Sequence, residues 1–310
     1  MDTEILPFGL AFENQHESGP VALLSFYEQQ NFVDDLGRPA YIKALTETSL
    51  QAVKDVGGLR YYGGSFDTNA VVGEDLVLDE VPNKHAAFLV LKQLETLAFS
   101  GVVGKLTVLA FKPARLPFGI TLSSGLSVLS RILNTIAPIT DKKWNKRREE
   151  EFLASTNVDG IQTEISNMYN EDLAEKKMFM LNLNKYKKVA TYEPGTKEAE
   201  DEPISGREAY GRYGKGGGFN IFRRGGYPYY MGFNCQTVLI TEQDTLEGQE
   251  WDQIILVHYP YRNKVIEMVT SDSYAARFYH RTAGMERAVV KPTLPWWDTP
   301  SDDYEIMSRM

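Results

Sequence analysis

Two blocks of the chain occur twice, in the same order and at nearly the same distance from one another. The first copy reads GRPAY from Gly37 and GGLRYYGG from Gly57, and the second reads GREAY from Gly206 and GGYPYYMG from Gly225. Chance matches between unrelated segments would not keep their spacing, so we expect two copies of one unit. A unit of this length indicates a domain duplication, because solenoid repeats are only about 20–50 residues long.

The composition supports a folded chain with two domains. The 310 residues are 43% hydrophobic, an ordinary fraction for a globular protein, and the length fits about two domains. The net charge of -9 argues against a nucleic-acid partner, because phosphate binding needs a concentrated basic surface. The basic cluster Lys142–Arg148 runs directly into Glu149–Glu151, which is typical of a solvated helix face.

A cytoplasmic location is expected from three features. The single cysteine, Cys235, cannot form an intramolecular disulfide, which favours a reducing compartment. The segment Met1–Gly19 carries acidic residues and lacks the basic and apolar regions of a signal peptide. No stretch has the roughly twenty apolar residues of a membrane helix, so we expect no membrane partner.

Each copy predicts the order strand, helix, strand, strand, helix, strand. Period-two alternation and β-branched or aromatic residues mark the strands, and proline ends the third strand of both copies. In the first copy the elements are expected at Val21–Tyr27, Pro39–Val56, Leu59–Val72, Leu76–Pro82, Lys84–Phe99 and Lys105–Phe111. In the second copy they are expected at Met178–Asn184, after Ser205, and at Tyr227–Leu239, Trp251–Tyr259, Tyr261–Arg287 and Ala288–Pro292. This order is that of the ferredoxin-like split βαβ unit.

The chain is therefore expected to divide into three parts. These are a first ferredoxin-like unit at residues 1–113, a helical connector at residues 114–176, and a second unit with a C-terminal tail at residues 177–310. Within the connector, Ser123–Ile136 is apolar at helical spacing and Asn145–Leu153 is charged, so two helices are expected.

Several segments together resemble a domain family of unknown function within the dimeric α/β-barrel superfamily. The resemblance rests on Met180–Tyr186, Gly206–Tyr210, Leu256–Pro260, Tyr274 and His280–Ala283. It covers the second copy closely and the first more loosely. In that superfamily two ferredoxin-like sheets face each other and close a barrel, usually from two chains. The resemblance implies an α+β fold in which two tandem ferredoxin-like (βαββαβ) units form an intramolecular dimeric α/β-barrel.

The resemblance does not select an activity. Members of the superfamily include cofactor-free monooxygenases, cyclases, isomerases, haem enzymes and proteins of no known activity, so fold analogy cannot choose among them. A barrel of about eight strands leaves room for side chains or for one small ligand. The barrel interior is therefore the default site, and its chemistry has to be argued from individual residues.

Strand alternation suggests which residues would bind a substrate. If Leu181 and Leu183 point at the helices, the alternate positions of that strand point into the barrel. The candidates are Asn182 and Asn184 with Met180, the matching Ser25 and Tyr27 with Leu23, and the tyrosines Tyr62 and Tyr229 from the repeated pairs. Such a lining suits a small apolar or aromatic molecule. The alternative role for Asn182 is a structural hydrogen bond to a neighbouring strand.

Three residues are candidates for catalysis. His258 lies near the end of a strand, and histidine can act as a general base near neutral pH. Arg281 or Tyr230 would stabilise the resulting oxyanion, and Asn182 would orient the substrate. Arg281 could also bind a carboxylate, with its neighbour His280 as a further binding residue. The alternatives are a rim histidine without a catalytic role and a pair on the helix surface.

No cofactor or metal is expected. The four histidines are scattered and the lone cysteine has no thiol partner, so a metal-binding pattern is not recognisable. The run Gly214–Gly218 lacks the residue order of a phosphate-binding loop. Because each glycine weakens a helix by about 1 kcal/mol relative to alanine, we expect Gly216–Gly218 to break or loosen the helix and to mark a functional opening.

These observations predict a protein that binds a small organic molecule, aromatic or polyketide-like, in the barrel cavity. It would transform the molecule by cofactor-free acid/base chemistry such as oxygenation, cyclisation or isomerisation. The alternative is a non-catalytic binding or structural protein, its barrel filled by Tyr27, Tyr62, Met180 and Met231. The chain would be a monomer with an internal pseudo-dimer, or a homodimer. One working site is expected, organised by the second copy.

Overall fold

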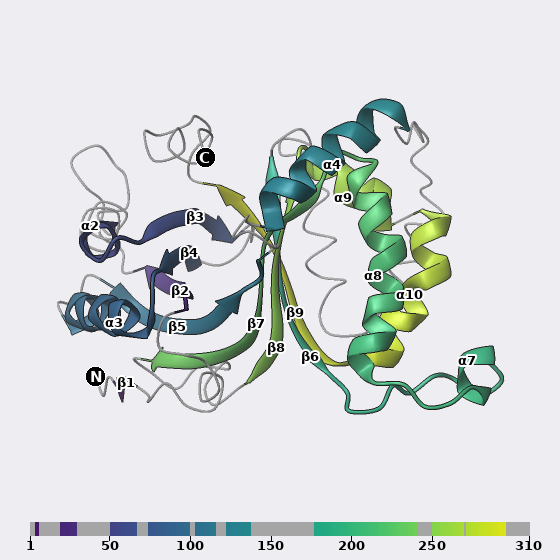
Figure 1. Ribbon diagram of the computed structural model, residues 1–310, viewed down its shortest axis with the longest axis horizontal. Helices are drawn as coiled ribbons and strands as arrows, with labels where there is room; N and C mark the ends of the chain where they lie inside the picture. Colours follow the sequence, from purple (N-terminus) through teal and green to yellow (C-terminus); the bar gives the residue numbers. More distant parts are fainter. Residues whose placement is uncertain are drawn as a thin grey trace. The chain divides into compact units, whose positions relative to one another are not determined.

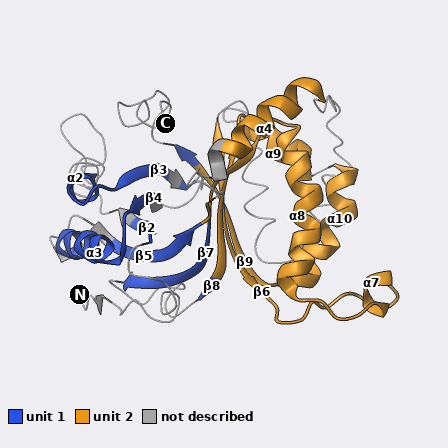
Figure 2. Ribbon diagram, viewed as in Figure 1, with its two compact units in different colours: residues 1–113, 232–251, 294–310 blue, residues 114–231, 252–293 orange. Residues whose placement is uncertain are grey.

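The computed structural model describes residues 4–5, 19–29, 50–66, 74–99, 103–115, 122–137, 177–240, 250–269 and 271–295. The chain forms two compact units, coloured separately in Figure 2. Unit 1 comprises residues 1–113, 232–251 and 294–310, and unit 2 comprises residues 114–231 and 252–293. The basic cluster Lys142–Arg148, the expected helix Asn145–Leu153 and most of the expected helix Pro39–Val56 lie outside the described residues.

Unit 1 is an antiparallel sheet with two helices packed on one face. Its elements are β1 (Glu4–Ile5), β2 (Val21–Gln29), α2 (Leu50–Asp55), β3 (Leu59–Phe66), β4 (Glu74–Val81), α3 (Lys84–Phe99) and β5 (Val103–Pro113). The strand order is β5-β2-β4-β3, and the later part of β7 (Tyr227–Ile240) continues the sheet beside β5.

The core of unit 1 lies between α3 and the sheet. The strand β2 supplies Leu23 and Tyr27, β4 supplies Val77, and α3 supplies Val90 and Leu91, all almost inaccessible to solvent. Their large apolar side chains fill the layer between helix and sheet.

Unit 2 also has helices over one face of an antiparallel sheet (Figure 1). Its elements are α4 (Leu122–Ile136), β6 (Met178–Tyr186), α7 (Lys197–Glu200), α8 (Gly206–Phe222), the first part of β7, β8 (Trp251–Tyr259), α9 (Arg262–Val269), α10 (Asp272–Gly284) and β9 (Met285–Pro295). The strand order is β9-β6-β8-β7, and α8 and α10 lie side by side.

The two repeated Gly-Gly blocks form turns of the same geometry. Gly57 and Gly225 both have left-handed backbone, with φ angles of 72° and 80°, which glycine adopts without steric cost. The glycine that follows each of them donates its amide to an earlier helical carbonyl, 2.8 Å away at Val53 and 3.0 Å away at Ile221. A Cβ atom at that second glycine would lie 2.8 Å from a carbonyl oxygen of the adjacent strand in either unit. Glycine is therefore required at the same place in both turns.

The helices of unit 2 differ from expectation in two ways. The helix α8 runs unbroken through Gly214–Gly218, with Ser205 as its N-cap accepting the Glu208 amide at 3.1 Å. The prediction of a break is wrong, because the cap and the packing of α10 along α8 outweigh the low helix propensity of glycine. The single helix expected at Tyr261–Arg287 is two helices, α9 and α10, and Ser271 caps the second.

The helix α4 confirms the first of the two helices expected in the connector. It packs against the end of α8 and the turn after it. Ser130 Oγ donates to the Gly226 carbonyl at 2.8 Å, and Arg223 Nε donates to the Ala137 carbonyl at 2.6 Å. Within the described part of the chain, helices long and apolar enough to cross a membrane are absent, α4 included.

Candidate functional site

A cavity of about 370 Å³ lies in unit 2, between the sheet and the helices that cover it. Apolar side chains provide most of its surface. The strands contribute Met180, Asn182, Pro228, Met231, Gln253, Ile255, Val257, Tyr259 and Val290. The helices contribute Tyr210, Gly211, Tyr213, Gly214, Gly217, Gly218, Ile221, Val265, Met268, Val269, Tyr274 and Arg281. This candidate site lies in the helix–sheet layer of one unit, whereas the sequence predicts a site inside a barrel.

The face of β6 that we expected to line the barrel points toward the helices instead. Met180 and Asn182 line the cavity, and Met180 packs in one apolar cluster with residues of α9 and α10. Leu181 and Leu183 lie on the other face and are fully buried there. Because the strand carries buried apolar residues on both faces, its alternation reveals the period but not which face meets the helices.

Four glycines of α8 line the cavity, together with Tyr210, Tyr213 and Ile221 of the same helix. Gly211, Gly214, Gly217 and Gly218 recur at helical spacing and line the cavity. A Cβ atom at Gly211 or Gly214 would meet no atom within 4 Å. The absence of side chains at these positions leaves part of the cavity open. The glycine-rich segment is thus a thin wall of the site and not a break in the helix.

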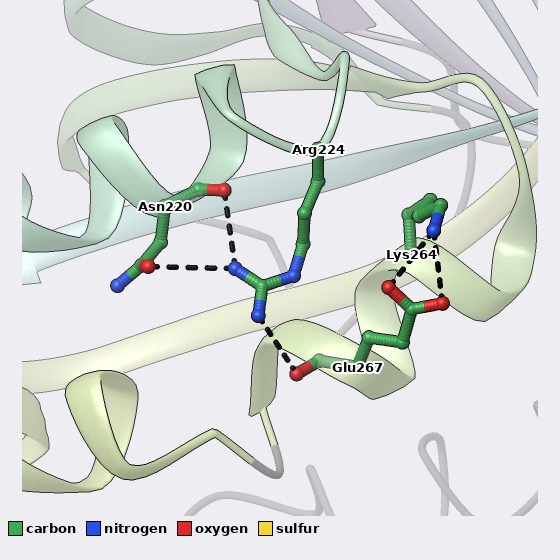
Figure 3. A network of polar contacts seen from close by, with 4 residues as sticks. All are labelled: Asn220, Arg224, Lys264 and Glu267. Carbon is green, nitrogen blue, oxygen red and sulfur yellow. Dashed lines mark hydrogen bonds and ion pairs between the residues drawn. The ribbon is translucent and has the colours of Figure 1, made fainter. Parts of the chain in front are cut away.

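A buried arginine holds the end of α8 against α9 (Figure 3). Arg224 Nη1 lies 3.3 Å from the backbone oxygen and 3.4 Å from the side-chain oxygen of Asn220, and it donates to both. Arg224 Nη2 donates to the Glu267 carbonyl at 3.3 Å. The Glu267 carboxylate binds Lys264 Nζ at 2.9 Å. These bonds fix two of the helices that cover the cavity.

On the helix side of the cavity, the polar lining residues are Arg281 and three tyrosines. Arg281 is 5% exposed, and its Nη2 atom makes no hydrogen bond to any residue that the structure describes. Its guanidinium lies 5.5 Å from the centre of the Phe278 ring. Burial raises the pKa of Tyr210, Tyr213 and Tyr274, and the charge of Arg281 opposes the rise for each. The three hydroxyls are therefore protonated at neutral pH.

Two amides belong to the strand side of the cavity. Asn182 Nδ2 donates to the backbone oxygens of Met180 at 3.1 Å and Ile255 at 3.4 Å, which is the structural bond named above as its alternative role. Gln253 accepts a hydrogen bond from the Tyr186 hydroxyl. Asn184, the other predicted amide, is buried but is not part of the cavity lining.

His258 lies on the opposite face of the sheet from Arg281. Its neighbours on both sides in β8 line the cavity, so the imidazole points away from it. The ring packs against Phe179 at 5.2 Å and Tyr227 at 4.9 Å, measured between ring centres. Burial lowers the pKa of His258 to about 4, and the positive charge of Lys177 adds to the shift. The structure does not bring the predicted general base and the predicted oxyanion binder together.

The other predicted residues of unit 2 also lie outside the cavity. The Nδ1 atom of His280 is 2.9 Å from the Tyr192 hydroxyl, a contact separate from the cavity lining. Tyr229 packs edge-on against Phe179 at 5.1 Å, on the same sheet face as His258. Tyr230 is buried and does not contribute to the lining.

The three predicted residues of the first copy are buried within unit 1. Tyr27 packs with Leu23 against α3, and Ser25 lies between them in the alternation, on the same helix-covered face. This face is again the reverse of the expected one. Tyr62 is paired with Leu78, whose neighbour Val77 faces α3, so Tyr62 lies on the face away from the helix.

No role for the cavity tyrosines is predicted from the sequence. Tyr210 and Tyr213 belong to the helical spacing that continues with Gly214 and Gly217. A continuous helix through this segment would have grouped all four on one face. Because the glycines were expected to break the helix, this shared face was not predicted.

The chemistry that the cavity offers is hydrogen-bond donation and one positive charge. Its described lining residues include no carboxylate and no imidazole. In the described part of the chain, no three histidine, cysteine, aspartate or glutamate side chains lie close enough together to bind a metal ion.

Comparisons with known proteins do not assign a family. No family model and no curated protein matches the chain. A protein of unknown function from Rhodopseudomonas palustris is 22% identical, over 50% of this chain and 96% of that one, with a TM-score of 0.33. A mutant chlorite dismutase from Candidatus Nitrospira defluvii is 9% identical, over 95% and 96% of the two chains, with a TM-score of 0.43. An anthrone oxidase-like protein is 11% identical, over 91% and 93%, with a TM-score of 0.39. Similarities this low assign no activity to the chain.

Proposed function

We propose that unit 2 binds a small, mainly apolar organic molecule in the cavity between its sheet and the helices α8, α9 and α10. The observation that carries this proposal is the cavity itself, about 370 Å³ of space with apolar walls and a few polar groups. Ligand pockets have this composition and a volume of about 300–1,000 Å³. Methionine, valine and isoleucine walls suit an aromatic ring or a branched chain, because methionine adapts its shape to the occupant.

The arrangement favours binding over cofactor-free acid/base catalysis. A general base in the cavity would need a group that accepts a proton near neutral pH. The described lining has no carboxylate or imidazole, and burial keeps its four tyrosines protonated. The predicted base, His258, lies on the other sheet face. Of the two functions that the sequence leaves open, non-catalytic binding is the one that this geometry supports.

We further infer that the two units are tandem ferredoxin-like copies of one ancestor, divided near residues 113 and 176 as the sequence predicts. Two observations support this. Each sheet has its four strands in the spatial order fourth, first, third, second, and the two Gly-Gly turns share one geometry. The copies differ in the helix–sheet layer, which Leu23 and Tyr27 fill in unit 1 and which holds the cavity in unit 2.

Filling the cavity from α8 tests the proposed binding. The Gly214→Phe variant places a large ring into the cavity, and Lys215→Phe adds the same ring at the next residue, which is exposed and does not line the cavity. Calorimetry with a series of neutral aromatic amides, from benzamide to naphthalene-2-carboxamide, measures the affinity. We expect wild type and Lys215→Phe to bind alike, and Gly214→Phe to bind at least about tenfold more weakly, a loss of about 1.4 kcal/mol. Equal binding by all three proteins, or binding by none, would contradict the proposal.

A further inference from the structure

We infer that the ligand of this cavity is a carboxylic acid whose carboxylate binds Arg281 while its apolar body occupies the rest of the space. The inference rests on the proposed function and names the substrate class of the same site. It is carried by the state of Arg281 and by the groups around it.

Arg281 is a buried positive charge that has no counter-charge among the residues that the structure describes. It is the one charged side chain among the described lining residues, and Nη2 has no hydrogen-bond partner among the described residues. Its interactions with the described residues are the contact with the Phe278 ring and the electrostatic effects on the neutral tyrosines. A buried charge is costly unless it is paired. A ligand anion would supply the missing partner.

Unit 1 shows an arginine of similar burial that is paired within the protein. Arg60 Nε lies 3.1 Å from Asp79 Oδ1, and both side chains are almost fully buried. In the repeat, Pro228 takes the place of Arg60 and Val257 the place of Asp79, and both line the cavity. Unit 2 therefore has apolar wall where unit 1 has an ion pair, and its own buried arginine stands on α10 with its charge available to a ligand.

The groups beside Arg281 fit one carboxylate. Tyr274, Phe278 and Arg281 occur at successive turns of α10 and share one face of the helix. The planar guanidinium can bind both oxygens of a carboxylate, and protonated hydroxyls such as that of Tyr274 can donate to the same oxygens. A doubly charged phosphate would keep one negative charge uncompensated among apolar walls. One cation and several neutral donors therefore favour a monoanion.

The affinities of matched acids and amides test the inference. The ratio of the two affinities would not change if Arg281 had only a structural role. Benzoate, 3-phenylpropanoate and naphthalene-2-carboxylate are each compared with the amide of the same skeleton, by calorimetry on the full chain. We expect the wild-type protein to bind the best acid at least about tenfold more tightly than its amide. Arg281→Met should lose this preference, so that the acid and its amide bind with similar affinity. The control Arg277→Met removes an exposed charge from the same helix and should keep the preference.

The outcomes separate this inference from the proposed function. If wild type binds amides and acids equally, the cavity is a binding site but the carboxylate assignment is wrong. If neither series binds, both proposals are wrong. Should Arg281→Met fail to fold, Arg281→Lys keeps the charge and removes the planar fork. A preference for the acid that survives undiminished in Arg281→Lys would contradict bidentate binding, and the comparison on wild type decides the charge preference without any variant.

Discussion

Gly284, the last residue of α10, lies so close to the backbone oxygen of Gly206, the first residue of α8, that a Cβ atom has no room between them. Lys187 joins the two glycines. Its amide donates to the Gly284 carbonyl and its carbonyl accepts the Gly206 amide, each at 3.0 Å. This contact sets the separation of two helices that cover the cavity.

Replacing Gly284 with alanine should therefore destabilise the protein. The added methyl group would push against the Gly206 backbone, which cannot rotate away as a side chain would, and overpacking of this kind costs about 1–3 kcal/mol. Urea unfolding of Gly284→Ala measures the loss. An unchanged midpoint would show that the two helices separate there without cost.

Replacing Gly214 with alanine should instead stabilise the protein. A Cβ atom at this position meets nothing within 4 Å, so Gly214→Ala improves the helix by about 0.5–1 kcal/mol without a clash. The two variants serve as matched controls for one another in the same unfolding experiment. A destabilised Gly214→Ala would mean that α8 is not helical at this point.

The half-buried imidazole of His258 should make stability depend on pH. Its pKa in the folded chain is about 4, below the ordinary value of 6.5, so folding favours the neutral ring. The stabilisation is complete above pH 6.5 and is lost as the pH falls toward 4, by an amount on the order of 3 kcal/mol. His258→Phe keeps an aromatic ring beside Phe179 and should flatten the stability curve in this window. Parallel curves for variant and wild type would show that the ring titrates normally.

Removing one partner of the Arg60–Asp79 ion pair should destabilise the protein more than removing both partners. Burial raises the pKa of Asp79, and Arg60 opposes that shift. Asp79→Leu removes the carboxylate that faces a buried guanidinium and should cost about 3–5 kcal/mol, whereas the pair Arg60→Met with Asp79→Leu should recover most of that loss. Denaturant unfolding of the single and double variants checks this. If the single and the double variant lost the same free energy of unfolding, an apolar pair could not replace the ion pair, and the prediction would be wrong.

The strands of the second copy were predictable because their signals are local. The strands β6 and β8 lie at Met178–Tyr186 and Trp251–Tyr259, close to the expected bounds, because alternation marks their lengths and Pro260 ends the second one. Two predicted residues, Asn182 and Arg281, do line one cavity. Their residue types already indicate hydrogen bonding and anion binding, whatever element carries them.

The position of the site was not predictable from those signals. Leu181 and Met180 are both apolar and both buried, so nothing local decides which of them meets the helices, and an error of one residue exchanges the two faces. For the same reason, His258 lies on the opposite face of the sheet from Arg281, which it was expected to approach. The cavity depends on how closely α8 approaches the sheet, and that is a property of packing between distant segments.

Because glycines of α8 line the cavity, single mutations can change the volume of the cavity in small steps. Any of these glycine codons becomes an alanine or valine codon through one base change, because the three codon families differ only at the second position. At Gly214 the new side chain would project into free space. Descendants of this chain could thus exchange one ligand size for another without altering the sheet or Arg281. Their helix would strengthen as the cavity shrank, so selection for a smaller ligand and selection for stability would act in the same direction.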